Sequence, residues 1–172
     1  MFKNPEIALD TLPGIEHLDW QYLDPGYKRR LLIPRVLMVL AIGIVVIAGM
    51  FILNVPRLQT AVLVAILAIA AVPILIWPLF SVPRRAYVVR DLDIVFRSGV
   101  FWRSVTAVPF NRIQHVETST TPLDRKFGLS TLKLFTAGGS KGDLKIDGLG
   151  RTVAEQLRVF ILAKAGSSFE SA

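Results

Sequence analysis

The residues that could perform catalysis are few in this chain of 172 residues. It has no cysteine, which excludes disulfides, thiolate metal sites and thiolate nucleophiles. Its two histidines, His17 and His115, are far apart in the sequence and lack carboxylates at metal-site spacing. No HExxH or GxSxG motif is present. We therefore expect no catalytic set, no metal and no cofactor, and His115 is expected to be a structural or surface imidazole.

The segment GGSKGD at residues 138–143 has a superficial likeness to a phosphate-binding loop. It lacks the GxxxxGK[ST] spacing, and it precedes an expected strand instead of a helix. No helix N-terminus would therefore face a phosphate there. We expect residues 138–142 to form the loop of a β-hairpin.

Basic side chains have the clearest potential for binding, because the charge is unevenly placed. Residues 1–35 carry five basic and five acidic residues, whereas residues 82–172 carry fourteen basic and eight acidic ones. A basic side chain near a charged leaflet contributes about 1 kcal/mol of attraction to anionic headgroups. A solvated basic surface without a ligand is the alternative. The candidate contacts to headgroups or to a partner are Arg112, Arg125, Lys126, Lys133, Lys141 and Lys145.

A basic module could also bind nucleic acid. Phe96, Phe101 and Trp102 interleave with Arg97 and Arg103, as in a platform on which bases stack. The chain has no recognition-helix or RNP-type motif, however, and apolar spans are an unusual carrier for such a module. We expect no nucleic-acid partner.

Two uncharged apolar segments precede the basic module. Residues 36–53 and 60–80 contain no ionisable side chain. At 1.5 Å per residue each crosses or nearly crosses a hydrocarbon core about 30 Å thick. They predict a transmembrane hairpin over residues 28–81, and their lack of ionisable groups argues against a pump or transporter made from this chain alone. A signal peptide is a poorer interpretation, since a second span follows the first.

The loop charges predict the orientation of this hairpin. Four basic residues shortly precede the first span and three follow the second, whereas the connection over residues 54–59 carries only Arg57. Positive residues are enriched in cytoplasmic loops. We therefore expect a multi-pass protein of the inner cell membrane with both termini in the cytoplasm.

Residues 82–166 predict a small α+β domain. A polar N-terminal segment at 1–27 and the hairpin precede this domain, and a tail at 167–172 follows it. Alternating runs indicate strands at 86–90, 92–97, 102–108, 113–120, 129–136 and 143–146. Residues 121–128 predict a turn or one helical turn closed by Gly128. The helical spacing from Leu149 to Ile161 predicts an amphipathic helix of about fifteen residues. Thr152 and Glu155 form its expected capping box, and Gly166 its expected end.

Several short motifs carry a family resemblance. They include Val108-Pro109, RIQHV at 112–116, FGL at 127–129 and TAG at 136–138, with LDP at 23–25 ahead of the hairpin. In these features the chain resembles the bacterial pleckstrin-homology (PH-like) family of YdbS-like membrane proteins. The resemblance implies a two-helix transmembrane hairpin followed by an α+β PH-like split β-barrel or sandwich with one C-terminal amphipathic helix. It implies no reaction.

We therefore expect a non-enzymatic, membrane-anchored scaffold or accessory subunit. It would assemble with a second PH-like membrane protein, or with its own copies, through an exposed strand edge or through the hairpin. The resemblance suggests a role in envelope stress or in resistance to membrane-active peptides. The alternative is a sensor or binder of anionic lipid headgroups at the inner leaflet, with membrane lipids as the partner.

Overall fold

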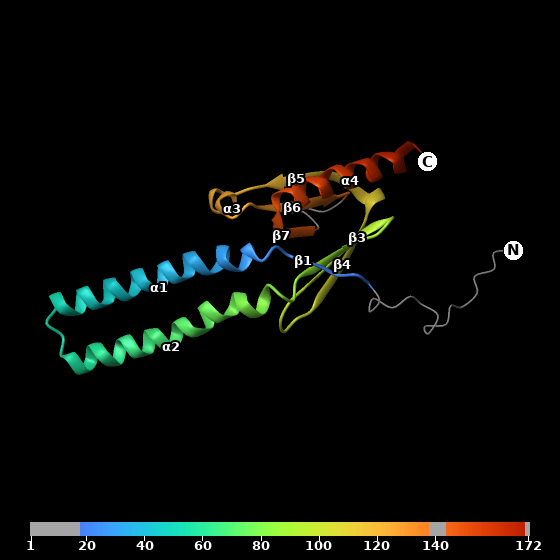
Figure 1. Ribbon diagram of the computed structural model, residues 1–172. Coiled ribbons are helices and arrows are strands. Elements are labelled where there is room, and N and C mark those ends of the chain that lie inside the picture. The colour runs from blue at the N-terminus through green and yellow to red at the C-terminus, as the bar shows by residue number, and fades with distance from the viewer. Residues whose placement is uncertain (1–17, 138–143, 171–172) are drawn as a thin grey trace, which may run out of the picture.

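Two long helices project side by side from a β-domain in the computed structural model, which describes residues 18–137 and 144–170 (Figure 1). Helix α1 spans Gly26–Ile52 and helix α2 spans Arg57–Ser81. Their lengths of about 40 Å and 38 Å exceed the thickness of a hydrocarbon core. Both predicted spans are thus helical. The first two turns of α1 are polar, so the predicted apolar span begins later than the helix does.

Most large apolar side chains of α1 and α2 are exposed, including those of Leu37, Val45, Phe51 and Ile69. A long apolar helix in the core of a soluble protein would instead be mostly buried. Exposed apolar side chains around helices of this length suit lipid, because the helical backbone satisfies its own hydrogen bonds. The two helices are therefore long and apolar enough to cross a membrane.

The first sheet combines strands from both sides of the helical hairpin. Its order is β1 (Gln21–Tyr22), β2 (Ala86–Val89), β3 (Asp93–Ser98) and β4 (Ser104–Pro109), with every pair antiparallel. Gln21 lies opposite Tyr87, so α1 and α2 are inserted between two neighbouring strands. The sequence prediction assigned residues 1–27 to a polar segment, because a strand of two residues is too short to show alternation.

The second sheet has the order β5-β6-β7 and follows the short helix η3 (Phe110–Arg112). Its strands are β5 (Ile113–Ser119), β6 (Leu129–Thr136) and β7 (Leu144–Gly150), and helix α3 (Pro122–Lys126) connects β5 to β6. The predicted helical turn before Gly128 is confirmed, and Gly128 has a φ of +66°. The prediction ended this strand at Ile146, because Gly148 and Gly150 interrupt the apolar alternation. In the structure β7 continues to Gly150.

The C-terminal helix α4 (Arg151–Glu170) corrects two predictions. Thr152 lies inside the helix and is therefore not its N-cap, and Glu155 accepts a hydrogen bond from Arg158 Nη2 at 2.6 Å. Gly166 does not end the helix. A glycine within a helix costs only about 1 kcal/mol relative to alanine, which the helix can tolerate when no left-handed turn follows.

One apolar core joins the two sheets and α4. Phe110 of η3 packs edge-to-face on Phe160 of α4, with ring centroids 5.9 Å apart. Leu23 and Tyr27, which precede most of the hairpin, also belong to this core, so the hairpin is anchored in the β-domain. The buried core residues are Leu23, Tyr27, Val82, Tyr87, Ile94, Val108, Phe110, Ile113, Val116, Leu129, Leu132, Leu134, Leu144, Ile146, Leu149, Ala154, Leu157 and Ile161.

Candidate membrane-facing site

A mostly buried ion pair holds α3 against the base of α1. Arg30 Nε donates a hydrogen bond to Asp124 Oδ1 at 2.6 Å, and the Asp124 side chain is 8% exposed. Asp124 also completes a capping box: its N–H donates to Thr121 Oγ1, and its Oδ2 accepts from the Thr121 N–H. One carboxylate therefore fixes both the start of α3 and its position beside α1.

The hydrogen bonds of Asp124 also set its ionisation. Burial alone raises the pKa of this carboxyl, but the hydrogen bonds from Thr121 and Arg30 outweigh burial and lower the pKa below its ordinary value. Asp124 is therefore charged at neutral pH, when it can pair with Arg30.

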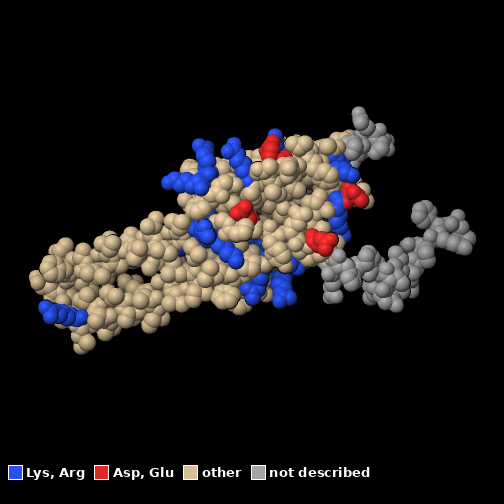
Figure 2. Space-filling view, viewed as in Figure 1, with Lys and Arg blue, Asp and Glu red and all other residues tan. Residues whose placement is uncertain are grey.

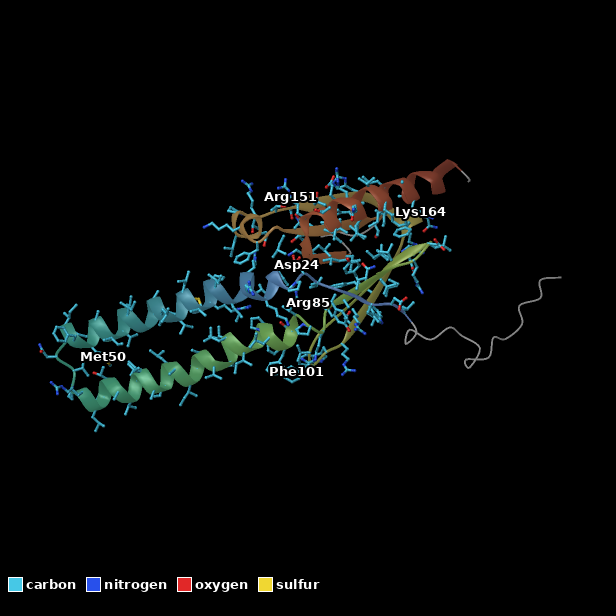
Figure 3. The ribbon with its side chains drawn as sticks, viewed as in Figure 1. Asp24, Met50, Arg85, Phe101, Arg151 and Lys164 are labelled. Atoms are coloured by element: carbon cyan, nitrogen blue, oxygen red, sulfur yellow. The ribbon has the colours of Figure 1, made fainter. Side chains whose placement is uncertain are left out.

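A second contact joins the start of α1 to β7. Gly148 has a φ of +77°, and a Cβ added to it would lie 2.3 Å from Cγ of the Tyr27 ring. The Asp24 N–H donates to the Gly148 carbonyl at 2.9 Å, and Arg85 Nη1 donates to the Tyr27 hydroxyl at 3.5 Å. Figure 3 shows Asp24 and Arg85 where the helices meet the β-domain. Segments before α1 and after α2 are therefore packed together against β7.

The loop between β3 and β4 places aromatic side chains beside the end of α2. Phe101 and Trp102 are 77% and 88% exposed, and the Phe101 ring centroid lies 5.9 Å from that of Trp77 on α2 (Figure 3). Gly99 makes this loop possible, because its φ is +108° and a Cβ would lie 1.7 Å from the Trp102 carbonyl oxygen. Exposed aromatic residues at the end of an apolar helix are typical of a membrane–water interface.

Figure 2 shows several basic side chains on one face of the β-domain near its junction with the helices. Arg84 Nη1 donates to the Phe80 carbonyl at 2.8 Å, and Arg35 Nη1 donates to the Leu31 carbonyl at 3.3 Å. We call the following group the basic collar. It comprises Lys28, Arg29, Arg30 and Arg35 of α1, Arg84 and Arg85 after α2, Arg103 of the β3–β4 loop, and Arg125 and Lys126 of α3.

The structure brings together two of the six residues predicted as headgroup or partner contacts. Arg125 and Lys126 are exposed neighbours on α3, within the basic collar. Arg112 is also exposed, but it precedes β5, whereas α3 follows β5. Seven residues of extended strand span about 23 Å, so Arg112 lies well away from the α3 pair.

The other three predicted residues lie elsewhere on the second sheet or outside the described residues. Lys133 of β6 is paired with Glu117 of β5 at 3.2 Å, and Lys145 of β7 with Asp147 at 3.0 Å. Lys141 lies outside the described residues, as do the GGSKGD segment and His17. Binding of a headgroup or partner by any of the six stays a prediction.

The sequence interpretation missed the contacts that position this site. Arg97 stacks on Trp20, with its guanidinium carbon 4.3 Å from the ring centroid, and donates to the Tyr22 hydroxyl at 3.3 Å. These contacts join residues separated by the whole hairpin, so no local pattern announces them. The capping box is different, since Thr121 and Asp124 stand at the spacing of a helix N-terminus.

His115 was predicted to be a structural or surface imidazole. His115 is exposed on β5, and its ring centroid lies 5.7 Å from that of Phe135. Residues 18–137 and 144–170 contain no group of three or more His, Cys, Asp or Glu side chains that could hold a metal ion.

A four-stranded and a three-stranded sheet closed by one C-terminal helix, carried on two apolar helices, define a membrane protein with a PH-like domain. The family described as "Bacterial PH domain" matches residues 30–165, which is most of the chain. The chain belongs to this family, and the predicted family and fold class are confirmed.

One curated relative is itself a membrane protein. The UPF0699 transmembrane protein YdbS of Bacillus subtilis (strain 168) is 43% identical over 51 residues, which cover 30% of this chain and 32% of that protein. The match therefore spans about a third of that relative's length. Among solved structures, a DUF1696 family protein with a pleckstrin-homology domain from Shewanella loihica PV-4 is 23% identical. That alignment covers 49% of this chain and 73% of the other, with a TM-score of 0.38.

Proposed function

We propose that this protein is a non-enzymatic, membrane-anchored accessory subunit that assembles with a second PH-like membrane protein or with its own copies. The observation that carries this proposal is the outer edge of β4. Within the described residues β4 pairs with β3 alone, so its other edge has no strand partner there. Such an edge is a template on which another chain can add a strand.

β4 also lacks the features that usually protect an edge strand. Its sequence SVTAVP contains no charged residue, Val105 is 50% exposed, and Pro109 stands only at the end of the strand. The other edges differ: β5 carries Glu117, β7 carries Lys145 and Asp147, and β1 is two residues long. Because charges and short lengths discourage edge pairing, β4 is the best suited of the described edges to accept a partner strand.

The test is purification of the full-length protein from its native membranes in mild detergent, with mass spectrometry and a mass measurement of the complex. We expect a stoichiometric complex with a membrane protein carrying a PH-like domain, or a homo-oligomer. Val105→Lys combined with Ala107→Lys should dissociate it by placing charges on the β4 edge. Gln114→Lys, at an exposed position of β5, is a control that adds one charge away from β4. A monomer recovered alone contradicts the assembly, and a complex that survives the β4 substitutions contradicts this interface.

We further propose that both flanks of the hairpin lie on the cytoplasmic side of the inner membrane. Pairing of β1 with β2 supports a common side, because β1 precedes α1 and β2 follows α2. The basic flanks, compared with the single Arg57 in the connection, favour the cytoplasm.

The physiological setting that we propose is envelope stress or exposure to membrane-active peptides, and it rests on the family resemblance alone. A deletion strain should be more sensitive to such peptides than its parent. Equal sensitivity of the two strains would contradict this setting.

The basic collar favours a second candidate function, the binding of anionic lipid headgroups at the inner leaflet. Its members belong to the start of α1, the residues just after α2, α3 and the β3–β4 loop, and headgroups would lie near this end of a hairpin of this length. Arg125 and Lys126 are exposed there, and Asp124 beside them is already engaged by Arg30. The two exposed side chains on α3, unlike Arg30 of the same collar, are therefore available to attract a negatively charged leaflet.

A further inference from the structure

Two adjacent hollows flank the Gly99 turn at the foot of α2. The first has a volume of about 320 Å³ and lies between Trp77, Ser81 and Arg85 of α2 and its exit, the turn at Ser98 and Gly99, and Lys145 of β7. The second, of about 260 Å³, lies on the β4 side of the same turn. Ser98 and Gly99 line both hollows, which are therefore neighbours, and we call the two together the cleft.

The charged side chains that line this cleft are all cationic. No Asp or Glu lines either hollow. Among the described residues, the four arginines of the cleft form no ion pair, whereas Lys145 is paired with Asp147. The cationic residues are Arg85 and Lys145 in the first hollow and Arg84, Arg97 and Arg103 in the second.

Neutral contacts hold three of these guanidinium groups, and that of Arg84 donates to the Phe80 carbonyl. Arg85 donates to the Tyr27 hydroxyl, and Arg97 lies over the Trp20 ring and donates to the Tyr22 hydroxyl. A guanidinium group has five N–H donors, so most donors remain for a ligand. Arginines that are oriented and lack a carboxylate partner suit recognition of a phosphate group.

The position of the cleft indicates which kind of molecule could supply a phosphate group to these arginines. Trp77 belongs to the last turns of the apolar helix α2, and the exposed Phe101 ring lies beside it. Aromatic side chains of this kind occupy the membrane–water interface. In Figure 3, Arg85 lies at the junction of α2 with the β-domain, and Phe101 lies near the same end of α2. We therefore expect the cleft to lie near the depth of lipid phosphates, beside the apolar helix α2.

We propose that this cleft binds the phosphate group of an anionic phospholipid from the leaflet on which the β-domain rests. The inference deepens the second candidate function above and rests on it. It places specific recognition of one lipid at the end of α2. Arg125 and Lys126 on α3 would instead attract the charged leaflet without a specific site. Of the five predicted contacts that lie in the described residues, only Lys145 lines the cleft. The assembly proposed for β4 does not depend on it.

The test uses the full-length protein in an uncharged detergent, titrated with phosphatidylglycerol, phosphatidylcholine or inorganic phosphate. Native mass spectrometry counts the bound lipid. In the variant Arg85→Gln with Arg103→Gln, the apparent affinity for phosphatidylglycerol should fall about tenfold to thirtyfold. The variant Arg125→Gln with Lys126→Gln removes the same charge from α3 and should change it little. Arg103→Gln alone should give a smaller loss without affecting folding, because Arg103 makes no hydrogen bond or ion pair with any described residue.

Each other outcome overturns the inference in a distinguishable way. Loss of phosphatidylglycerol binding in the α3 variant alone places the lipid on α3, and the lipid-binding function then stands without this cleft. Equal binding of phosphatidylglycerol and phosphatidylcholine by every variant refutes anionic-lipid recognition as a whole. Tight binding of inorganic phosphate without a preference for either lipid makes the ligand a soluble anion.

Discussion

The substitution Gly148→Ala tests the packing that fixes the hairpin to the β-domain. Two costs follow from the structure. The first is backbone strain, since a φ of +77° in a residue with a Cβ costs about 1–2 kcal/mol. The second is steric, since the new Cβ would lie 2.3 Å from Cγ and 2.6 Å from both Cδ atoms of Tyr27. Forcing an extra methyl group into such a packed site typically costs about 1–3 kcal/mol.

Gly128→Ala is the matched control, because it carries the first cost without the second. Gly128 has a φ of +66°, and no described atom lies within 4 Å of its added Cβ. Thermal unfolding of the full-length protein in detergent, followed by tryptophan fluorescence, compares the two variants. At about 2–4 °C per kcal/mol for a chain of this size, Gly148→Ala should lower the midpoint by roughly 2–12 °C more than Gly128→Ala.

A double-mutant cycle then assigns the steric cost to Tyr27. In a Tyr27→Ala background the ring is absent, so Gly148→Ala should cost about as little as Gly128→Ala does. The reasoning is refuted if the two glycine variants lose equal stability in the wild-type background. It is also refuted if removing the Tyr27 ring leaves the cost of Gly148→Ala unchanged.

Three further predictions concern the ion pair, the topology and the anchoring of β1. Because the folded protein lowers the pKa of Asp124, this carboxylate stabilises the fold above its ordinary pKa of about 3.9, and the stabilisation is lost as the pH falls through the lowered pKa. Asp124→Asn should therefore lower the midpoint of thermal unfolding at pH 7. The difference in midpoint between this variant and wild type should become smaller below about pH 4, and a difference that does not change with pH would argue against the ionised pair. The chain has no cysteine, so Arg57→Cys should react with an impermeant maleimide in intact cells and Arg103→Cys only after permeabilisation, and the reverse pattern would invert the proposed orientation. Arg97→Ala should speed amide hydrogen exchange at residues 20–22 about twofold to fivefold, as expected for a cation–π contact of about 0.5–1 kcal/mol, and unchanged exchange would mean that Arg97 does not anchor β1.

The elements that were predicted well have a strong local signal. Residues 36–53 and 60–80 are apolar without interruption, so only helices satisfy their backbone in lipid. β6 spans Leu129–Thr136 as predicted, because Leu132, Leu134 and Thr136 alternate with Lys133 and Phe135 ahead of the glycine-containing segment. Gly128 ends the α3 turn because a residue in the left-handed region is needed there.

The predictions that were wrong concerned the ends of α4. The capping-box pattern at Thr152 and Glu155 is present in the sequence, but the helix begins at Arg151 and leaves both residues inside it. Glycine frequently ends a helix, yet α4 continues past Gly166 to Glu170. Capping residues shift the free energy of a helix end by about 1 kcal/mol, which the packing of Ala154 and Leu157 in the core can override at the N-terminal end. At Gly166 the cost of a glycine inside a helix is equally small.

The sequence by itself determined that this protein has two apolar spans, a basic β-rich domain and a C-terminal amphipathic helix. These properties depend on local composition and periodicity, which the chain carries whatever its neighbours are. Only the tertiary structure decided that β1 joins β2 across the hairpin, that Tyr27 packs on Gly148, and that Arg30 reaches Asp124. It also gathered Arg85, Arg97, Arg103 and Lys145 around one cleft. These contacts join residues far apart in the chain, and their geometry follows from how the two sheets and the hairpin pack, which no local pattern encodes.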